Sequence, residues 1–211
     1  MHQEFLHELA LVAGECGLGV STRCRGLLGE DPSTGELRVA DIAVRGLRPS
    51  RLAVLGDASV THPFGGRGQA RGSPSPASAV HTPLAAASHR ERDKVRRYGV
   101  ACQAAGYDFV PLVSETYGGL GEALQRFLLE LADRAVQRSW VGPVAAEHLS
   151  GSTDQGVLAS VGRQRARYLR RWRARLSLVR ARSVAARLLG SCADVLSVGD
   201  GVVHWGVEAG V

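Results

Sequence analysis

Two apolar segments at residues 37–45 and 52–61, joined by a short turn at 46–50, constrain the fold of this chain most. The first alternates, with Leu37, Val39, Asp41 and Ala43 on one face, at the period of two that is typical of a strand. The second is rich in β-branched and small apolar residues. We therefore predict a β-hairpin, which needs a covering layer to bury its apolar face.

The segments around the hairpin predict further helices and strands. Apolar side chains recur at helical spacing at 3–14, with glutamates on the polar face. The other expected elements are a strand at 20–28, a helix at 85–105, a strand at 107–113 and a helix at 120–136. Pro111 has no N–H to give to a ladder, so the strand that contains it is expected at a sheet edge or at a bulge. The order α-β-β-β-α-β-α predicts an α/β fold with a mixed central sheet flanked by helices.

Changes in composition divide the chain. We expect one domain at 1–138, interrupted by an insertion at 64–88 whose Gly, Ser, Pro, Ala and Arg residues are unsuited to a core. A linker is expected at 139–157 and a basic helix at 158–189, and the tail at 190–211 is left unassigned.

The composition excludes several classes of protein. In 211 residues, 45% are hydrophobic and 22% charged, and no apolar run near the start is long enough to span a bilayer. The first residues lack the pattern of a signal peptide, and the four cysteines form no C-x-x-C pair, so neither a disulfide framework nor a zinc finger is indicated. We expect a protein of the nucleus or cytoplasm, not secreted and without a membrane partner.

Positive charge is the more informative property. The formal net charge is +6, which favours polyanionic partners, nucleic acid first. All but one of the 26 basic residues are arginine, and the exception is Lys94. A chain that replaces lysine almost everywhere makes that single lysine a candidate for a specific role.

Asp41 and Asp57 lie inside the two apolar hairpin strands. Desolvation of a carboxylate in such a place costs on the order of several kcal/mol unless something compensates it. If the hairpin folds about Arg48, position 41 faces position 55 and Asp57 is its diagonal neighbour, which is close enough for one cation to join both acids. Two carboxylates, a backbone carbonyl and waters suit Mg²⁺.

Ordinary explanations compete with this interpretation. An aspartate near a strand end is commonly solvated or bonded to a turn, and Lys94 on its own would be a solvent-facing helix residue. The combination of the two acids with a lysine on the following helix favours a site.

The combination resembles a known family. The residues that carry the resemblance are Ala40-Asp41-Ile42, 55–63 around Asp57, 94–98 from Lys94 to Tyr98, 106–111 and 115–121. They resemble the restriction-endonuclease-like domain, of the PD-(D/E)XK fold, at the carboxyl end of site-specific non-LTR retroelement polyproteins. The resemblance covers about residues 1–138. It implies that Asp41 and Asp57 are the metal-binding acids, that Lys94 is the catalytic lysine moved to a helix, and that Tyr98 is the tyrosine after it.

The sequence also departs from that family. Ala40 replaces the usual proline, Arg97 stands where a second lysine often occurs, and Ser59 means that the direct D-x-K form is absent. The resemblance implies a Mg²⁺-dependent (or Mn²⁺-dependent) DNA endonuclease of retroelement origin that nicks target DNA, with element RNA as a further candidate partner. The alternatives are a catalytically inactive DNA-binding or structural remnant of a mobile element, and a decaying reading frame without a cellular role.

Three secondary features have two interpretations each. Tyr98 would position a phosphate or Lys94, or else be a core aromatic residue. The loop at 115–119 precedes a helix that Thr116 or a neighbour would cap, leaving N–H groups for a phosphate, or it is a plain turn. Glu8 and Glu15 would add a carboxylate to the site, although a surface position is favoured.

The segment 158–189 contains ten arginines and no acidic residue. Trp172 lies in a narrow apolar stripe, so we expect the helix to pack through Trp172 and to present arginine elsewhere. The arginines predicted to contact DNA phosphates are Arg163, Arg167, Arg170, Arg171 and Arg175. A surface helix in which arginine merely replaces lysine is the alternative.

Overall fold

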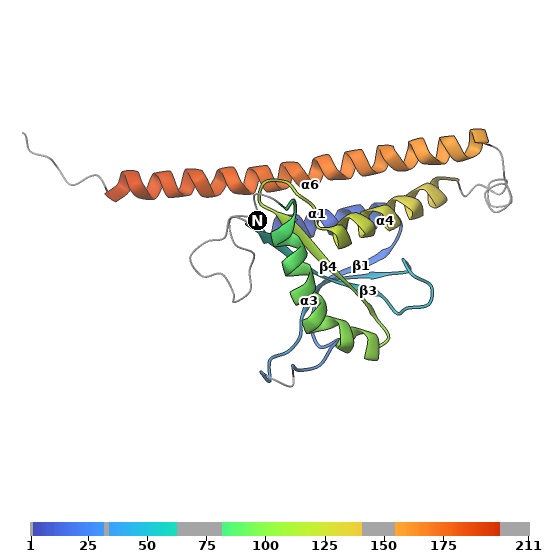
Figure 1. Cartoon of the computed structure of the whole chain (residues 1–211), viewed down its shortest axis with the longest axis horizontal. Coiled ribbons are helices and arrows are strands. Elements are labelled where there is room, and N and C mark those ends of the chain that lie inside the picture. The colour runs from blue at the N-terminus through green and yellow to red at the C-terminus, as the bar shows by residue number, and fades with distance from the viewer. Residues whose placement is uncertain (1, 32–33, 63–81, 141–154, 199–211) are drawn as a thin grey trace, which may run out of the picture.

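The computed structural model describes residues 2–31, 34–62, 82–140 and 155–198 (Figure 1). In that part of the chain, four strands and four helices form an α/β fold with a mixed sheet flanked by helices. The elements are α1 (His2–Glu15), β1 (Gly19–Cys24), β2 (Ala40–Arg45), β3 (Val54–Thr61), α3 (Ala85–Ala104), β4 (Asp108–Glu115), α4 (Glu122–Trp140) and α6 (Gln155–Val198).

The sheet has the strand order β1-β2-β3-β4. The first three strands are antiparallel neighbours, whereas β4 runs parallel to β3 after the crossover helix α3. A parallel neighbour requires such a crossover, because a tight turn can only reverse the chain. β4 is an outer strand, which confirms the edge position expected from Pro111.

The hairpin pairs in a different register from the expected one. Ile42 faces Gly56 and Val44 faces Val54, so the predicted apposition of residues 41 and 55 is wrong by two residues. Continuing the observed register by one residue puts Asp41 directly across from Asp57. A shift of two keeps every side chain on its face, and for this reason the sequence pattern could not detect it.

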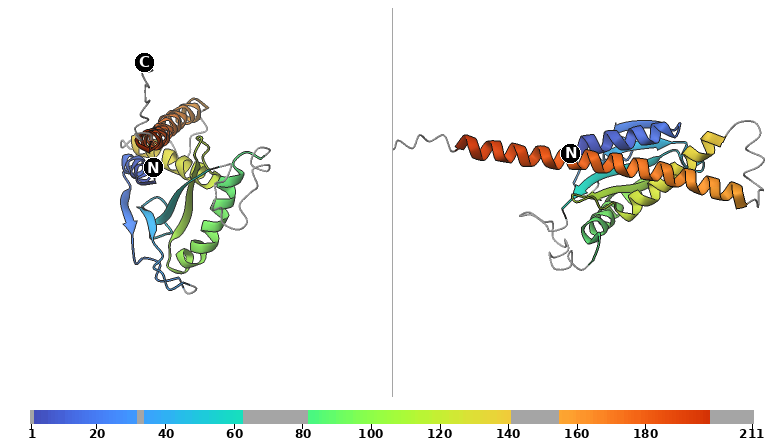
Figure 2. Two further views of the ribbon diagram at one scale, coloured as in Figure 1. Left: turned by 90° about the vertical axis from the view of Figure 1, so that its left-hand side faces the viewer. Right: turned by 90° about the horizontal axis from the view of Figure 1, so that it is seen from above.

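Helices cover both faces of the sheet (Figure 2, left). α1 and α4 pack on one face, where Phe5, Leu9, Leu124 and Leu128 join the inward side chains of β2, β3 and β4 in the larger core. α3 covers the other face, where Tyr98 and Cys102 pack with Leu55 in a smaller core. The sheet therefore has two buried faces, as expected when a crossover helix lies on one side.

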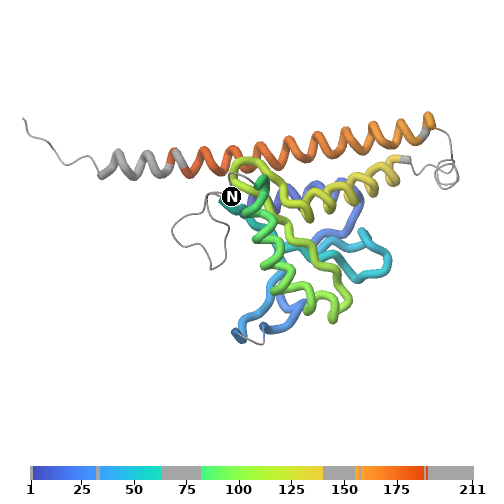
Figure 3. Tube along the Cα trace, in the orientation of Figure 1, coloured from blue at the N-terminus to red at the C-terminus, as the bar shows by residue number. Residues whose placement is uncertain are grey.

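α6 forms a third layer across α1 and α4 (Figures 1 and 3). Trp172 and Leu176 of α6 are fully buried in the larger core. Trp172 Nε1 also donates a hydrogen bond to Glu15 Oε2 at 3.0 Å. The residues 158–189 thus share a hydrophobic core with α1.

Several boundaries differ from expectation. β1 ends at Cys24 rather than at 28, and Gly26 beyond it has a left-handed backbone (φ 75°) that is not part of an extended strand. β2 begins at Ala40, later than expected, β4 runs to Glu115, and α4 extends to Trp140. Of the expected insertion at 64–88, linker at 139–157 and tail at 190–211, residues 64–81, 141–154 and 199–211 lie outside the described residues.

Gly56 generates a stability test, because an added Cβ would meet Leu112 Cδ1 and would lie 2.8 Å from Ile42 Cγ2. We expect Gly56→Ala to lower the free energy of unfolding by about 1–3 kcal/mol, since this overpacking outweighs the propensity gain of alanine. Urea denaturation measures it. Gly162→Ala in α6, with nothing within 4 Å of the added Cβ, is the control and should stabilise by up to about 1 kcal/mol. Equal effects would contradict the tight packing at Gly56.

Candidate active site

A cleft of about 770 Å³ opens at the end of the sheet where β2 begins and where β3 and β4 end. In α/β sheets, ligand sites are common at the carboxyl ends of parallel strands. The cleft is lined by Asp41, Asp57, Lys94 and Tyr98, the four residues singled out by the sequence. These residues come from β2, β3 and α3, and the folded sheet brings them together.

Asp41 is held by the backbone of the neighbouring strand. Its Oδ2 accepts a hydrogen bond from the Ala58 N–H at 2.7 Å. The carboxylate oxygen thus takes the place of the backbone carbonyl that usually accepts such an N–H in a sheet. His2 Nε2 lies 3.0 Å from the same carboxylate oxygen and 3.2 Å from the Ala58 carbonyl oxygen. The carboxylate is therefore fixed beside the main chain of β3, next to the residue that follows Asp57.

Lys94 reaches the acids from α3. Its Nζ lies 2.5 Å from Asp57 Oδ2, and its side chain is only 5% exposed. The helix interval between Lys94 and Tyr98 is one turn, so both side chains point from α3 onto the same face of the sheet. The only lysine of the chain therefore lies beside the acids, where the resemblance implies that it should be.

Burial controls the ionisation of this pair. Burial raises the pKa of Asp57, and the nearby Asp41 carboxylate adds to the increase, while Lys94 opposes it. Burial likewise lowers the pKa of Lys94, with Asp57 opposing that shift. Two carboxylates in contact destabilise each other's ionised form, so the site gains from a positive charge placed between them.

Tyr98 is a core aromatic residue that also borders the cleft, and its predicted role in positioning a phosphate or Lys94 stays a prediction. Its side chain is buried, and its ring centroid lies 5.2 Å from that of Phe109 in the smaller core. It also lines the cleft, and the pKa of its hydroxyl is raised by burial and by the charge of Asp57. Tyr98 therefore forms a wall of the site while it anchors α3 to the sheet.

The donor set fits a hydrated divalent cation. The carboxylates of Asp41 and Asp57 interact with each other, the Ala58 carbonyl shares the His2 contact of Asp41, and the buried Ser59 Oγ in the same cleft has no hydrogen-bond partner among the described residues. Within that part of the chain, no group of three or more His, Cys, Asp or Glu side chains is arranged to hold a metal ion. Few protein ligands and several retained waters are what Mg²⁺ prefers.

The structure adds cleft residues to which the sequence analysis gave no site role. Arg90 and Arg97 of α3 and Arg187 of α6 line the same cleft as the acids, and so do His62 and Tyr117. Arg90 and Arg97 share a helix face with Lys94, so helical spacing was an available signal. Arg187, His62 and Tyr117 arrive by tertiary folding, and no local pattern marks them.

The five arginines predicted to bind DNA fall into two groups. Arg163, Arg167 and Arg170 are exposed along α6. Arg171 is paired with Glu15, and Arg175 is paired with both Glu8 and Glu15 of α1. These two arginines fasten α6 to α1, and the two glutamates do not line the acid cleft.

The loop after β4 has a different local role from the expected one. Thr116 does not cap α4, because its Oγ1 donates to the Thr61 carbonyl at 3.1 Å. Glu91 of α3 accepts the Ala123 N–H at the start of α4, at 3.0 Å. Glu115 in turn accepts the Ala87 N–H at the start of α3, at 3.2 Å. The starts of α3 and α4 therefore each receive a hydrogen-bond acceptor from a glutamate of another element.

Comparisons with known proteins assign this chain to no family. No protein-family model matches the chain, and no curated protein or solved structure shows significant similarity to it. Among the helices of the described residues, none is sufficiently long and apolar to cross a membrane.

Proposed function

We propose that this chain is a divalent-cation-dependent DNA endonuclease of the restriction-endonuclease-like type, derived from a retroelement. The single observation that carries the proposal is the meeting of Asp41, Asp57 and the only lysine of the chain in one cleft. Asp57 lies 16 positions after Asp41, and Lys94 lies 37 positions after Asp57, yet the three side chains line one cleft. Each residue by itself would have an ordinary structural explanation.

Asp41, Asp57 and the Ala58 carbonyl would hold the cation, with Mg²⁺ favoured by oxygen ligands and Mn²⁺ as a substitute. When bound, the cation supplies charge stabilisation at the phosphate and a more acidic water. The lowered pKa of Lys94 suits a compact proton donor or acceptor at the attacking water. In the hydrolysis, the water oxygen bonds to phosphorus, one ester P–O bond breaks, and the departing oxygen takes a proton.

The cations around the acids support a phosphodiester substrate. Arg90, Arg97 and Arg187 would contact phosphates on both sides of the scissile bond. At a rise of about 1.5 Å per residue, Arg175 of α6 lies about 18 Å from Arg187, and Arg163 lies about 36 Å from it. These distances correspond to roughly 5–10 base pairs of duplex DNA. The exposed face with Arg163, Arg167 and Arg170 is therefore at a suitable distance to hold duplex DNA away from the cut.

The direct test is a plasmid-nicking assay with and without Mg²⁺. We expect nicking by the native chain only with the cation, loss of nicking in Asp57→Asn, and a rate at least about a hundredfold lower in Lys94→Arg. Arginine keeps the charge but is planar and never deprotonates at working pH. Arg96→Lys, exposed on the same helix, is the matched control and should nick at the native rate.

Moving the lysine to a second position, residue 59, shows whether a loss of nicking comes from lost chemistry or from lost folding. Ser59 lies two residues after Asp57 on the same strand face, with its buried Oγ unpartnered among the described residues. We expect Ser59→Lys to restore nicking to Lys94→Ala, with thermal unfolding of all variants measured in parallel. Native-rate nicking in Lys94→Arg would contradict the proposal. DNA binding without any nicking by the native chain would favour an inactive binding remnant.

The α6 arginines predict a salt effect. Replacing Arg163, Arg167 and Arg170 together by alanine should flatten the dependence of log affinity on log salt by about 0.9 for each phosphate that is no longer neutralised. Fluorescence anisotropy with a labelled duplex at several salt concentrations measures the slope. Arg126→Ala, an exposed arginine of α4 paired with Glu122, is the control and should keep the native slope. An unchanged slope in the triple variant would assign DNA binding to another surface.

A further inference from the structure

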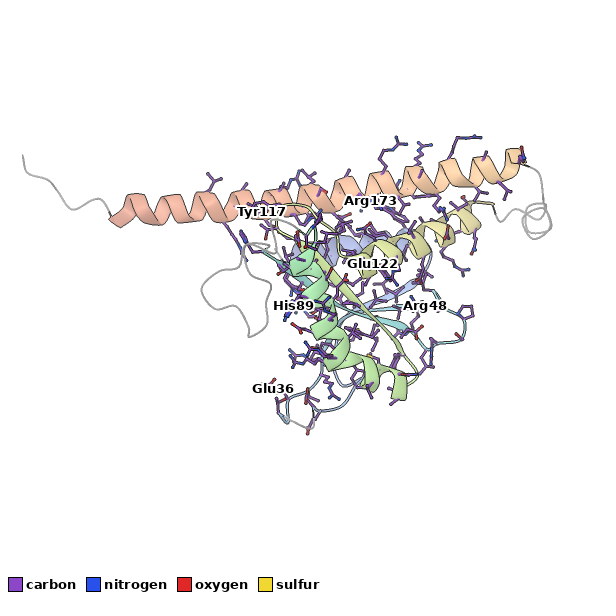
Figure 4. All side chains as sticks on the ribbon, in the orientation of Figure 1. Glu36, Arg48, His89, Tyr117, Glu122 and Arg173 are labelled. Atoms are coloured by element: carbon purple, nitrogen blue, oxygen red, sulfur yellow. The ribbon has the colours of Figure 1, made fainter. Side chains whose placement is uncertain are left out.

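Tyr117 lines the cleft, and the proposed chemistry does not use it. It follows β4, and 67% of its side chain is exposed although it is a large aromatic residue. Figure 4 shows it close to the start of α3 and below α6. Single exposed aromatic residues are common, but this one lines the charged cleft, where its ring can contact a flat group of a ligand.

The turn that carries Tyr117 is firmly built. The Glu115 N–H donates to the Gly119 carbonyl at 2.7 Å, and the Gly118 N–H donates to the Glu115 carbonyl at 3.0 Å. The Thr116 N–H donates to the Thr61 carbonyl at 2.8 Å, which joins the turn to the end of β3. The ring is therefore presented on a fixed support.

His62 sets the orientation of that ring. The two ring centroids are 5.3 Å apart with the planes at 68°, and the Tyr117 hydroxyl lies 3.2 Å from His62 Nε2. An edge-to-face contact with His62 is compatible with the stacking of another flat group on a tyrosine face. His62 and Tyr117 both line the cleft of Asp41 and Asp57.

Position along β3 fixes the distance from the acids. His62 lies five residues beyond Asp57, or about 16 Å at 3.3 Å per residue. The aromatic pair therefore lies a few nucleotides from a phosphate held at the acids. Arg187 and Arg90 line the same cleft and add positive charge that favours a nucleic-acid backbone there.

We propose that Tyr117, supported by His62, is a stacking platform for an unpaired base, and that the preferred substrate is DNA with unpaired nucleotides a few positions from the cut. This inference rests on the proposed function only for the position of the cut. Bases within a duplex are already stacked on both faces, so an aromatic side chain can stack only on a base that has left the helix.

Binding without cleavage tests the platform. A labelled duplex and the same duplex with a short unpaired segment carrying 2-aminopurine are titrated in EDTA, and anisotropy and 2-aminopurine fluorescence are recorded. We expect the native chain to prefer the unpaired substrate and to quench its fluorescence. Tyr117→Ala should bind that substrate about 5- to 150-fold more weakly, so that the ratio of the two affinities approaches one and quenching disappears.

Two variants make the result specific. Tyr117→Phe keeps the ring and should keep the preference and the quenching. Val100→Ala removes a more exposed apolar side chain of α3 outside the cleft and should behave as the native chain does. Equal affinity of the native chain for both substrates, or a Phe variant that behaves like the Ala variant, overturns the platform.

The two proposals fail separately. Mg²⁺-dependent nicking of fully paired plasmid, without a preference for unpaired substrate, removes the platform and leaves the endonuclease. A preference with quenching in a chain that never nicks removes the endonuclease and leaves a binder of unpaired DNA.

Discussion

The ion pair of Lys94 and Asp57 joins α3 to the middle of the sheet, and the arrangement of the cleft depends on it. Burying two charges is expensive, and apolar residues of similar size would usually be at least as stable. The cost here is greater because Asp41 brings a second carboxylate to the same place. Ionisable groups with shifted pKa values in a cleft mark a candidate functional site, and this is why the proposed chemistry is assigned here.

The helices around the sheet turn this local arrangement into an open site. α3 carries the lysine, while the buried guanidinium of Arg180 contacts the carbonyl of Gly119 and so fixes α6 beside the loop that holds Tyr117. One helical turn farther along α6, Val184 lines the cleft, followed by Arg187. The long helix therefore belongs to the wall of the site, and the Trp172 contact with α1 is one of the contacts that keep it there.

Local patterns predict the elements well and their pairing less well. Alternation in the hairpin places Asp41 and Asp57 on one face, but the expected register is wrong by two residues, because period-two patterns are unchanged by such a shift. The resemblance implies that Lys94 reaches the acids, although 36 residues separate it from Asp57, and the geometry agrees. No pattern indicates Tyr117 or Arg187, because their approach to the cleft depends on packing between distant elements. The charge of 158–189 predicts one DNA-binding face, whereas Arg171 and Arg175 are engaged by α1.

The single lysine offers the most direct measurement of the central claim. Lysine labelled with ¹³C at Cε gives one NMR signal from this chain, and that signal reports the ionisation of Lys94 without assignment. We expect a pKa below the ordinary value, because burial disfavours the ammonium, and a change in the signal when Mg²⁺ joins Asp57, absent in Asp41→Asn. An ordinary lysine pKa with no response to Mg²⁺ would place Lys94 in solvent and contradict a cation-dependent active site in this cleft.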